Sequence, residues 1–289
     1  MNRTESSTVI REMRAGDIES AMELKNAERW NQTESDWSHL LKQNPQLCLV
    51  ADVEGEVVGT VTAAKFGSEL AWIGMMLVAE QMRGRGLSKS LLGEILRRLE
   101  GCAAIKLDAT PNGQPIYERL GFIKERTIHR LEATAPVLTG MTHRGVAPER
   151  IQPGDLSNLV ALDLEIYGVD RRALIQFCLE SAPDRCWLVR QSNSIRGFLL
   201  GRPGSRNHYL GPMEAESLDM AKSLLAVASQ PGGPSGFVID VPADQVDLME
   251  WLVSGGFSLK RTLYRMHYRK NPGIGDETRQ YAIAGPEFG

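Results

Sequence analysis

A sequence motif occurs twice in this chain, 135 residues apart, and this repeat limits the fold more than any other feature. Residues 121–131 read GFIKERTIHRL and residues 256–266 read GFSLKRTLYRM, so both follow GF-x-x-x-R-T-[IL]-x-R-[LM]. Upstream of each copy, Lys-Ser-Leu-Leu occurs at 89–92 and again at 222–225. Similarity at a nearly constant offset is typical of a duplicated structural unit. The repeat therefore predicts two copies of one fold in tandem.

The length of the chain agrees with two domains. Since cores of about 100–150 residues are commonest, 289 residues are enough for a pair of them. We expect a first domain at 1–133, a linker with prolines and glycines at 134–149, a second domain at 150–270 and a tail at 271–289. The tail has no apolar periodicity, so we expect it to be disordered.

Apolar periodicity predicts similar elements in both halves. In the first half, strands are expected at 9–13, 47–53, 57–65, 71–78, 103–107 and 122–131, with helices after Asp17, Thr33 and Gly86 and a short one ending at Leu120. In the second half, helices are expected at 155–167, 171–179, 216–228 and 244–254, and strands at 186–191, 196–201, 207–211, 236–241 and 259–268. Thr33 and Asp36 have capping-box spacing, and Glu54-Gly55 predicts a hairpin turn.

The composition excludes several classes of function. The chain is 42% hydrophobic and 24% charged with a net charge of −3, and no basic stripe with interleaved aromatics occurs, so we expect neither a nucleic-acid partner nor membrane binding. No run approaches the ~18–20 apolar residues of a membrane span, and residues 1–8 lack a signal-peptide pattern. The four cysteines lack CxxC spacing and the five histidines lack HExxH, so we expect buried thiols, a cytoplasmic protein and no metal site.

Only the first copy has a loop suited to a phosphate group. An apolar run at 71–78 leads into the loop RGRG at 83–86, and an amphipathic helix follows at 87–99. Free backbone amides and the helix dipole favour an anion there, and glycines let the backbone approach it closely. The second copy has an acidic segment, ESLDMA, at 216–221. The alternative is a tight strand-to-helix connection without a ligand; the spacing fits neither the Walker A loop nor the dinucleotide fingerprint.

This loop carries a family resemblance. Residues 78–88, VAEQMRGRGLS, resemble motif A of the GNAT superfamily of acyl-CoA-dependent N-acyltransferases. The signature [QR]-x-x-G-x-[GA] falls on Arg83, Gly86 and Ser88, with serine in place of the usual glycine or alanine, and Gln81 gives a second register.

The resemblance covers residues 8–132 and, as a degraded second copy, about 150–268. It implies two GNAT-like domains in tandem, of which the second is degenerate. The fold class it implies is α+β, with a mostly antiparallel mixed sheet flanked by helices in each domain.

The resemblance also implies how acetyl-CoA binds as a cosubstrate. The strand edge at Met76 and Val78 would pair with the pantetheine arm, and the Met76 amide would polarise the acetyl carbonyl as a one-donor oxyanion hole. The CoA pyrophosphate would be held by the backbone amides of Arg83, Gly84, Arg85, Gly86, Leu87 and Ser88.

Residues 108–122 resemble motif B of the same superfamily, whose tyrosine protonates the departing CoA thiolate in many members; here it is Tyr117. A phenol with a pKa of ~10 suits a thiolate of pKa ~8.5, because it stays protonated until the charge appears. The alternative is a tyrosine that only packs on its helix. The second copy has Leu252 at this position, so we expect no second transferase.

The acceptor amine must be neutral when it attacks, so a base or a chain of water molecules has to remove its proton. Glu69 is one candidate base, and the others are Glu28, Glu34 and Asp36. In the family, the segment between the first two helices borders the acceptor pocket, so the resemblance assigns substrate contacts to Trp30, Asn31 and Gln32. Solvated carboxylates and a core tryptophan are the alternative.

Other notable residues are expected to serve local structure. Asp108 would cap the turn at Thr110, and turn geometry explains the segments at 201–204 and 211–212. A role in acceptor recognition is the alternative for Arg202.

Together these patterns predict an acetyl-CoA-dependent N-acetyltransferase that acetylates a primary amine of a small molecule by direct attack, with Tyr117 as general acid. Two alternatives stay open: a non-catalytic sensor or scaffold that binds acyl-CoA, and a protein lysine acetyltransferase. The sequence also leaves monomer and homodimer open.

Overall fold

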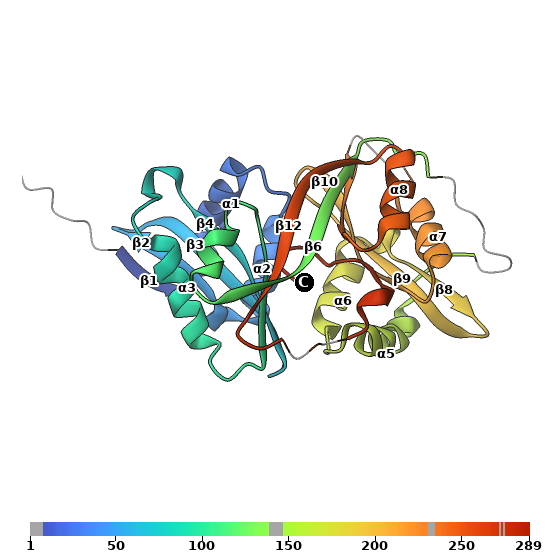
Figure 1. Cartoon of the computed structure of the whole chain (residues 1–289), viewed down its shortest axis with the longest axis horizontal. Helices are drawn as coiled ribbons and strands as arrows, with labels where there is room; N and C mark the ends of the chain where they lie inside the picture. The colour runs from blue at the N-terminus through green and yellow to red at the C-terminus, as the bar shows by residue number, and fades with distance from the viewer. Residues whose placement is uncertain (1–7, 139–146, 231–234, 272, 274) are drawn as a thin grey trace, which may run out of the picture. The chain divides into compact units, whose positions relative to one another are not determined.

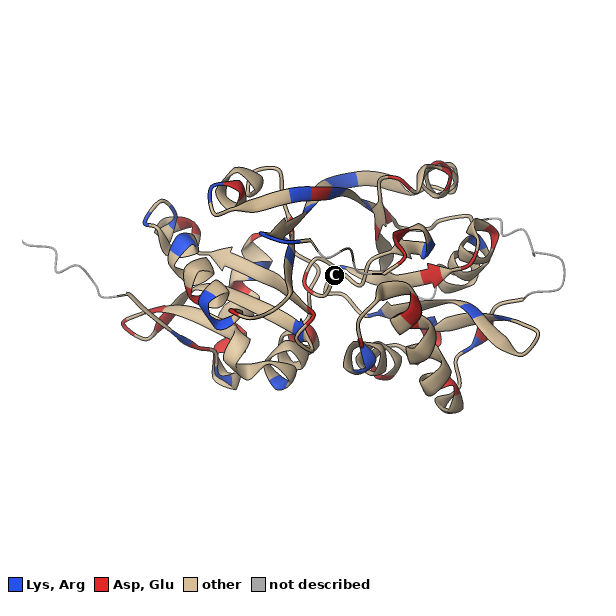
Figure 2. Cartoon of the chain, turned by 60° about the horizontal axis from the view of Figure 1, so that its bottom comes forward, with Lys and Arg blue, Asp and Glu red and all other residues tan. Residues whose placement is uncertain are grey.

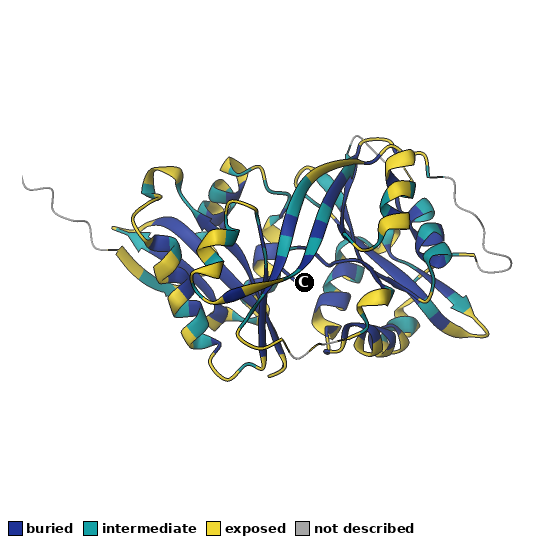
Figure 3. Cartoon of the chain, viewed as in Figure 1, coloured by how far each residue is buried: buried dark blue, intermediate teal, exposed yellow. Residues whose placement is uncertain are grey.

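The chain divides into two compact units, Met1–Ile105 with Phe288 and Lys106–Glu287 with Gly289 (Figure 1). The computed structural model describes residues 8–138, 147–230, 235–271, 273 and 275–289. Each unit contains a mainly antiparallel sheet with helices packed on it, which confirms the expected fold class. The strands of both units are largely buried, whereas the outer helix faces are exposed (Figure 3).

In the first unit the strands pair antiparallel in chain order: β1 (Thr8–Glu12), β2 (Cys48–Val53), β3 (Glu56–Phe66) and β4 (Leu70–Val78). The helices are α1 (Ile18–Ala27), α2 (Glu34–Gln43) and α3 (Leu87–Arg98). The expected capping box begins α2, since Thr33 Oγ1 accepts from the Asp36 amide at 3.4 Å and Asp36 accepts from the Thr33 amide at 2.6 Å. The expected hairpin at Glu54-Gly55 has positive φ angles of 55° and 92° at its two central residues.

The apolar stripe of α3 explains how the helix is fixed. Leu87, Leu91, Leu92 and Ile95 are buried, and α3 packs against β3. Gly59 of β3 allows close packing, because a Cβ atom there would lie 3.2 Å from Leu91 Cδ1. The N-terminus of α3 is therefore held at the end of β4.

In the second unit, which contains β5 from Lys106 on, the order of strands is β5-β12-β6-β11-β10-β9-β8-β7, and β13 also pairs with β10. Their bounds are β5 (Ala104–Ala109), β6 (Phe122–Ala133), β7 (Glu149–Arg150), β8 (Trp187–Gln191), β9 (Ser194–Arg202), β10 (Asn207–Ala215), β11 (Gly236–Pro242), β12 (Ser258–Tyr268) and β13 (Gln280–Ala282). The helices are α4 (Gln114–Glu118), α5 (Leu156–Tyr167), α6 (Arg172–Ser181), α7 (Leu218–Ala228) and α8 (Val246–Ser254).

The repeated motif forms two long strands that pair with each other. β6 and β12 run antiparallel, and Ile128 of β6 is in register with its sequence counterpart, Leu263 of β12. On either side of this pair the same residue types face each other, Arg130 opposite Arg261 and Arg126 opposite Arg265. The pairing therefore has approximate twofold symmetry.

Each of these strands lies beside a strand from the other half of the sequence. β6 lies between β12 and β11, and β12 lies between β5 and β6. We call this arrangement the strand exchange, and buried ion pairs accompany it. Arg130 of β6 binds Asp240 of β11 at 2.8 and 2.6 Å. In the same way, Arg265 of β12 binds Asp108 of β5 at 3.1 and 3.2 Å. The compact units therefore divide the chain at a different place from the sequence repeat.

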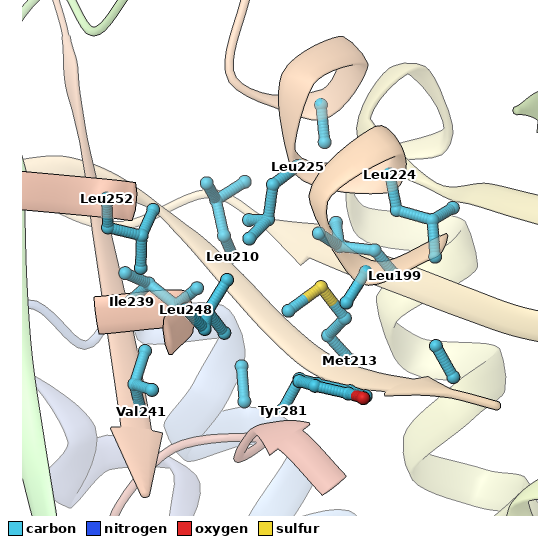
Figure 4. Packing of buried hydrophobic residues seen from close by; sticks show 14 of the residues in the cluster. Leu199, Leu210, Met213, Leu224, Leu225, Ile239, Val241, Leu248, Leu252 and Tyr281 are labelled. Atoms are coloured by element: carbon cyan, nitrogen blue, oxygen red, sulfur yellow. The ribbon is translucent and has the colours of Figure 1, made fainter. Parts of the chain in front are cut away.

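The core of the second unit lies between its sheet and helices α7 and α8 (Figure 4). Leucines on one face of each helix meet the inner face of β9, β10 and β11. The side chains in contact include Leu199, Leu210, Met213, Leu224, Leu225, Ile239, Val241, Leu248, Leu252 and Tyr281.

The C-terminal residues are ordered, so the expected disordered tail is wrong over the part that the structure describes. A short helix, η6 (Glu277–Arg279), precedes β13, which pairs antiparallel with β10. Tyr281 and Ala282 belong to the core of this unit, and Tyr281 is labelled in Figure 4. A three-residue strand gives no periodicity in the sequence, because its order comes from pairing and packing with distant residues. Residues 139–146 of the expected linker lie outside the described residues.

Candidate functional site

Strand β4 contains a bulge at the position assigned to the acetyl carbonyl. β3 and β4 are in register at Thr60 with Leu77 and at Thr62 with Gly74, so Met75 and Met76 together face a single residue of β3. Met75 has a φ of 49°, and the Thr60 hydroxyl donates to its carbonyl oxygen at 2.7 Å. A bulge of this kind breaks the regular ladder and changes the direction in which backbone groups point.

Side chains alternate along the end of this strand. Met75 and Leu77 are buried, whereas Met76 and Val78 are half-buried. The bulge takes the Met76 amide out of register with β3, which suits a backbone donor for a ligand. Sequence periodicity did not show the bulge.

The loop between β4 and α3 leaves helical amides without a side-chain cap. After a short helix, η3 (Glu80–Met82), Gly84 and Gly86 have φ angles of 79° and 82°, and Gly86 is the N-cap of α3. Its lack of a side chain leaves the first-turn amides of α3 without a side-chain acceptor. Since uncapped amides at a helix N-terminus attract anions, this end of α3 can bind a phosphate.

The two glycines are needed for the backbone conformation rather than for space in the folded chain. A Cβ atom at Gly84 or at Gly86 would meet no heavy atom within 4 Å. Residues other than glycine adopt a positive φ only at a cost in free energy. The open space above both residues leaves room for a ligand against the backbone. Of the other residues assigned to the loop, Arg85 is exposed, Ser88 is half-buried and Leu87 is buried.

The side chain of Arg83 is bonded to the end of β4 and to Glu28. Its Nε donates to the carbonyl oxygen of Val78 at 3.2 Å, and its guanidinium forms an ion pair with Glu28, just after α1. Arg83 thus fixes the loop to the end of β4. In the predicted anion site, Arg83 would contribute its amide and its long-range charge. Glu28 is a weaker candidate for the base, because its carboxylate is already paired.

Tyr117 lies on α4, in the second unit. The helix is preceded by a turn in which Gly113 donates to the Thr110 carbonyl and hydroxyl oxygens at 2.9 and 3.2 Å. The Tyr117 ring packs edge-on against Phe122, with centroids 5.8 Å apart, and Phe122 packs against Tyr268 at 5.1 Å. The second half of the sequence therefore supplies an aromatic residue to the surroundings of Tyr117.

Burial raises the pKa of Tyr117 to about 12. The phenol is therefore fully protonated near neutral pH and can donate a hydrogen bond to an anion. The raised pKa also makes it a weaker acid than a free phenol. Such a group gives up its proton only when a strong negative charge develops beside it.

The structure does not bring Glu69 to the bulge. Glu69 is exposed in the turn before β4 and lies seven positions before Met76 in the sequence, roughly 23 Å along the strand at about 3.3 Å per residue. A hydrogen bond from the Ser68 hydroxyl lowers the pKa of the Glu69 carboxyl and weakens it as a base. Both observations argue against the base role expected from the sequence.

The segment assigned to the acceptor connects α1 to α2. Trp30 and Asn31 are half-buried and Gln32 is buried. The buried Lys25 donates to the Trp30 carbonyl oxygen at 3.3 Å. On the other side, the Thr33–Asp36 capping box holds the start of α2. Asp36 is thus occupied by a structural role, whereas Glu34 is exposed.

In the second copy the corresponding positions cannot do the same chemistry. β9 and β10 are in register at Gly201 with Leu210 and at Leu199 with Met213, so Gly211 and Pro212 form the matching bulge. The expected turn at 211–212 is therefore a bulge inside a strand. The residue that matches Met76 is Pro212, which has no N–H to offer.

The second copy also differs from the first at the helix N-terminus and at the counterpart of Tyr117. The N-terminus of α7 is capped by Ser217, whose hydroxyl accepts from the Met220 amide at 3.4 Å. Leu252, the counterpart of Tyr117, is fully buried in the hydrophobic core. No phosphate loop and no acid remain at these positions.

Asp108 and Arg202, which were expected to cap a turn and to contact the acceptor or a turn, each form a buried ion pair. Asp108 does not cap the turn at Thr110, because its carboxylate binds Arg265. Arg202 is buried beside Glu287 and donates to the Ala284 carbonyl oxygen at 2.9 Å. These contacts support neither the expected cap by Asp108 nor a role of Arg202 in acceptor recognition.

Charged residues of both signs are distributed along the chain in each unit (Figure 2). Within the described part of the chain, no group of three or more histidine, cysteine, aspartate or glutamate residues is arranged to hold a metal ion. Among these same residues, each helix is too short or too polar to span a membrane. Cys48, Cys178 and Cys186 are buried free thiols, as expected, and Cys102 is half-buried.

Comparisons with known proteins identify the domain family of both halves of the chain. Models of the GNAT acetyltransferase domain match residues 18–133 and residues 159–282. An uncharacterised N-acetyltransferase of Bacillus subtilis, YitH, is 27% identical over 225 residues, covering 75% of this chain and 76% of the relative. A holothin acyltransferase of a Pseudoalteromonas species is 24% identical over 269 residues, covering 91% of this chain and 88% of the relative.

Solved structures share the fold over the whole chain. A protein of Pyrococcus horikoshii superimposes with a TM-score of 0.80 at 23% identity, covering 100% of this chain and 98% of its own. A GCN5-related N-acetyltransferase of Sphaerobacter thermophilus has a TM-score of 0.66 at 15% identity, covering 93% and 97%. With both halves matched by models of one domain family, this chain belongs to the GNAT acetyltransferases and carries two GNAT domains in tandem.

Proposed function

We propose that the chain is an acetyl-CoA-dependent N-acetyltransferase that acetylates a primary amine of a small molecule. The observation that supports this most is the uncapped, exposed N-terminus of α3, directly after a strand with a bulge at Met75 and Met76. Amides of residues 83–88 would hold the CoA pyrophosphate. The strand edge at Met76 and Val78 would pair with the amides of the pantetheine arm.

The transfer needs no covalent intermediate on the protein. The neutral amine attacks the thioester carbonyl carbon, a C–N bond forms, and the C–S bond then breaks to release the CoA thiolate. During the attack, the carbonyl oxygen becomes negative and the Met76 amide would donate a hydrogen bond to it. The proton of the amine leaves to water or to a base that the described residues do not single out.

Tyr117 would protonate the thiolate. Its raised pKa keeps the phenol protonated until C–S cleavage creates a charge, and its half-buried position lowers competition from water. Because a phenol of pKa about 12 is a weak acid, we expect the contribution to be a factor of about 10² rather than the upper end of general acid catalysis.

The acceptor would contact the segment at Trp30, Asn31 and Gln32. It lies in the same unit as the phosphate loop, and the capping box and Lys25 hold both of its ends. One relative that covers 91% of this chain is named for acyl transfer to holothin. That name favours catalysis over a sensor that only binds acyl-CoA.

The assignment of the loop can be tested with a charged substitution and a matched control. Gly86→Glu places a carboxylate at the N-terminus of α3, so the affinity for acetyl-CoA should fall by a factor of about 100 or more. Gly101→Glu is the control, because Gly101 has a φ of 93° and also no heavy atom within 4 Å of a Cβ atom. Both variants carry the same backbone strain and charge, but only the first lies in the loop. Equal affinities for acetyl-CoA in the two variants would refute the assignment.

A further inference from the structure

In the second GNAT domain a segment of the chain lies between two sheet strands. β10 and β11 pair with each other in parallel over residues 207–209 and 236–238. Beyond the bulge at Gly211-Pro212, β10 pairs instead with β13, where Met213 is in register with Ala282. On the other side, the amide of Ile283 donates to the Asp240 carbonyl oxygen of β11 at 3.1 Å. The C-terminal segment thus bonds to both strands.

Side chains hold this segment along its length. Tyr281 is 7% exposed and packs in the core with Met213 and Leu248 (Figure 4). Tyr209 Oη lies 3.1 Å from the Ile283 carbonyl oxygen. Gln245 donates to the Gln280 carbonyl oxygen at 3.2 Å. Residues 280–285 are all buried, as the residues of an internal strand are.

The place that this segment takes matches the one proposed for pantetheine in the first domain. Counting from the two bulges, Met76 corresponds to Pro212 and Val78 to Glu214. Gln280 of β13 is in register with Glu214, directly beyond the second bulge. A pantetheine arm and a peptide both carry amide groups that can pair with the edge of a strand.

We infer that the gap where β10 and β11 stop pairing, called the cleft below, is a peptide-binding site whose ligand is the chain's own C-terminal segment, residues 276–285, taken up by strand addition. The segment excludes acyl-CoA from the second domain. Pro212 and the Ser217 cap favour the same conclusion, because each removes an amide donor that acyl-CoA would need. The inference concerns the second domain and does not depend on the role proposed for Tyr117.

A cut made after folding tests this without asking a truncated chain to fold. A protease recognition sequence is inserted after Gly273, which is exposed, and a fluorophore is attached to the new C-terminal fragment. After cleavage of the folded protein, gel filtration shows whether the fragment stays bound. Its release is then followed with an excess of unlabelled peptide of residues 275–289, with and without saturating acetyl-CoA.

We expect the cut fragment to co-elute with the protein and to exchange with the peptide at a rate that acetyl-CoA leaves unchanged within about twofold. In the same protein, Tyr281→Ala should speed release by about 100-fold, since it removes a buried aromatic ring. Thr278→Ala, at an exposed position of the segment, is the matched control and should change release by less than about threefold.

Several results would overturn the inference. If acetyl-CoA accelerates release tenfold or more, the cleft is still a cofactor site. If the fragment is lost in gel filtration while the rest of the protein keeps its melting temperature, the segment is not a tightly held ligand. Equal release from the Tyr281 and Thr278 variants would show that the cleft does not hold it.

Discussion

The exchange of β6 and β12 predicts which buried charges depend on each other. The side chains of Asp108 and Arg265 are 0% and 5% exposed and form an ion pair across β5 and β12. Burial raises the pKa of the Asp108 carboxyl even though Arg265 opposes that shift, so desolvation outweighs the attraction. Loss of one partner then leaves the other buried without this counter-charge, at a cost of about 3–5 kcal/mol.

Asp108→Ala and Arg265→Ala should each lower the free energy of unfolding by that amount, about 3–5 kcal/mol. The double variant should lose less than the sum, with a coupling energy of about 2–3 kcal/mol, because it leaves no stranded charge. Arg130, the residue that corresponds to Arg265 in the repeat, is in the same half of the sequence as Asp108. Its strand, β6, lies two strands from β5, roughly 10 Å away. Its coupling to Asp108 should therefore stay below about 1 kcal/mol.

Urea unfolding followed by circular dichroism and by tryptophan fluorescence measures these energies. Arg97→Ala serves as a control, because the Arg97 side chain is 67% exposed in its ion pair with Glu94. An exposed pair of this kind contributes under about 1 kcal/mol. A larger coupling of Asp108 to Arg130 than to Arg265 would mean that the strands are not exchanged, and the account of the fold would be wrong.

Other substitutions test the site and the buried charges. Tyr117→Phe should lower kcat about 100-fold while the Kd for acetyl-CoA stays within about twofold; an unchanged kcat would remove Tyr117 from the mechanism. Glu69→Gln should leave kcat within about twofold, since Glu69 is exposed and far along β4 from Met76, and a 100-fold loss would restore it as the base. Glu214 is buried with Asp163 around one arginine, and burial raises its pKa well above the ordinary value, so the folded protein holds a proton that the unfolded chain releases. The stabilisation from that proton is fully present below the pKa of Glu214 in the unfolded chain. It is lost as the pH rises through the pKa of Glu214 in the folded protein. Glu214→Gln should therefore make urea midpoints fall less between pH 5 and pH 8 than they do in the wild type, and parallel curves would contradict this.

Local sequence signals predicted the elements that short-range chemistry controls. Thr33 and Asp36 are close in sequence and form the capping box that begins α2, as their spacing predicts. The hairpin at Glu54-Gly55 and the stripe of α3 are likewise set by neighbouring residues. The phosphate loop is also predicted from neighbouring residues, because its glycines lie between a strand and a helix, and its role in binding stays a prediction.

Features that depend on distant pairing were missed. The bulge at Met75 arises from the register between β3 and β4, and nothing in the local sequence marks it. Tyr281 is in the core because β13 pairs with β10, almost 70 positions earlier in the chain, although the tail itself has no apolar pattern. The strand exchange had a signal in the repeated motif, because two copies of one strand sequence can pair symmetrically. The repeat alone did not show which neighbours each strand would take.

The central claim is that the chain has one acyl-CoA site, at the loop before α3, and a second domain closed by its own C-terminal segment. Calorimetric titration of the intact protein with acetyl-CoA, recording stoichiometry, tests it most directly. The account predicts one site per chain, lost in Gly86→Glu and retained in Gly101→Glu. Two sites per chain would contradict the closed second domain, and no binding would contradict the transferase proposal itself.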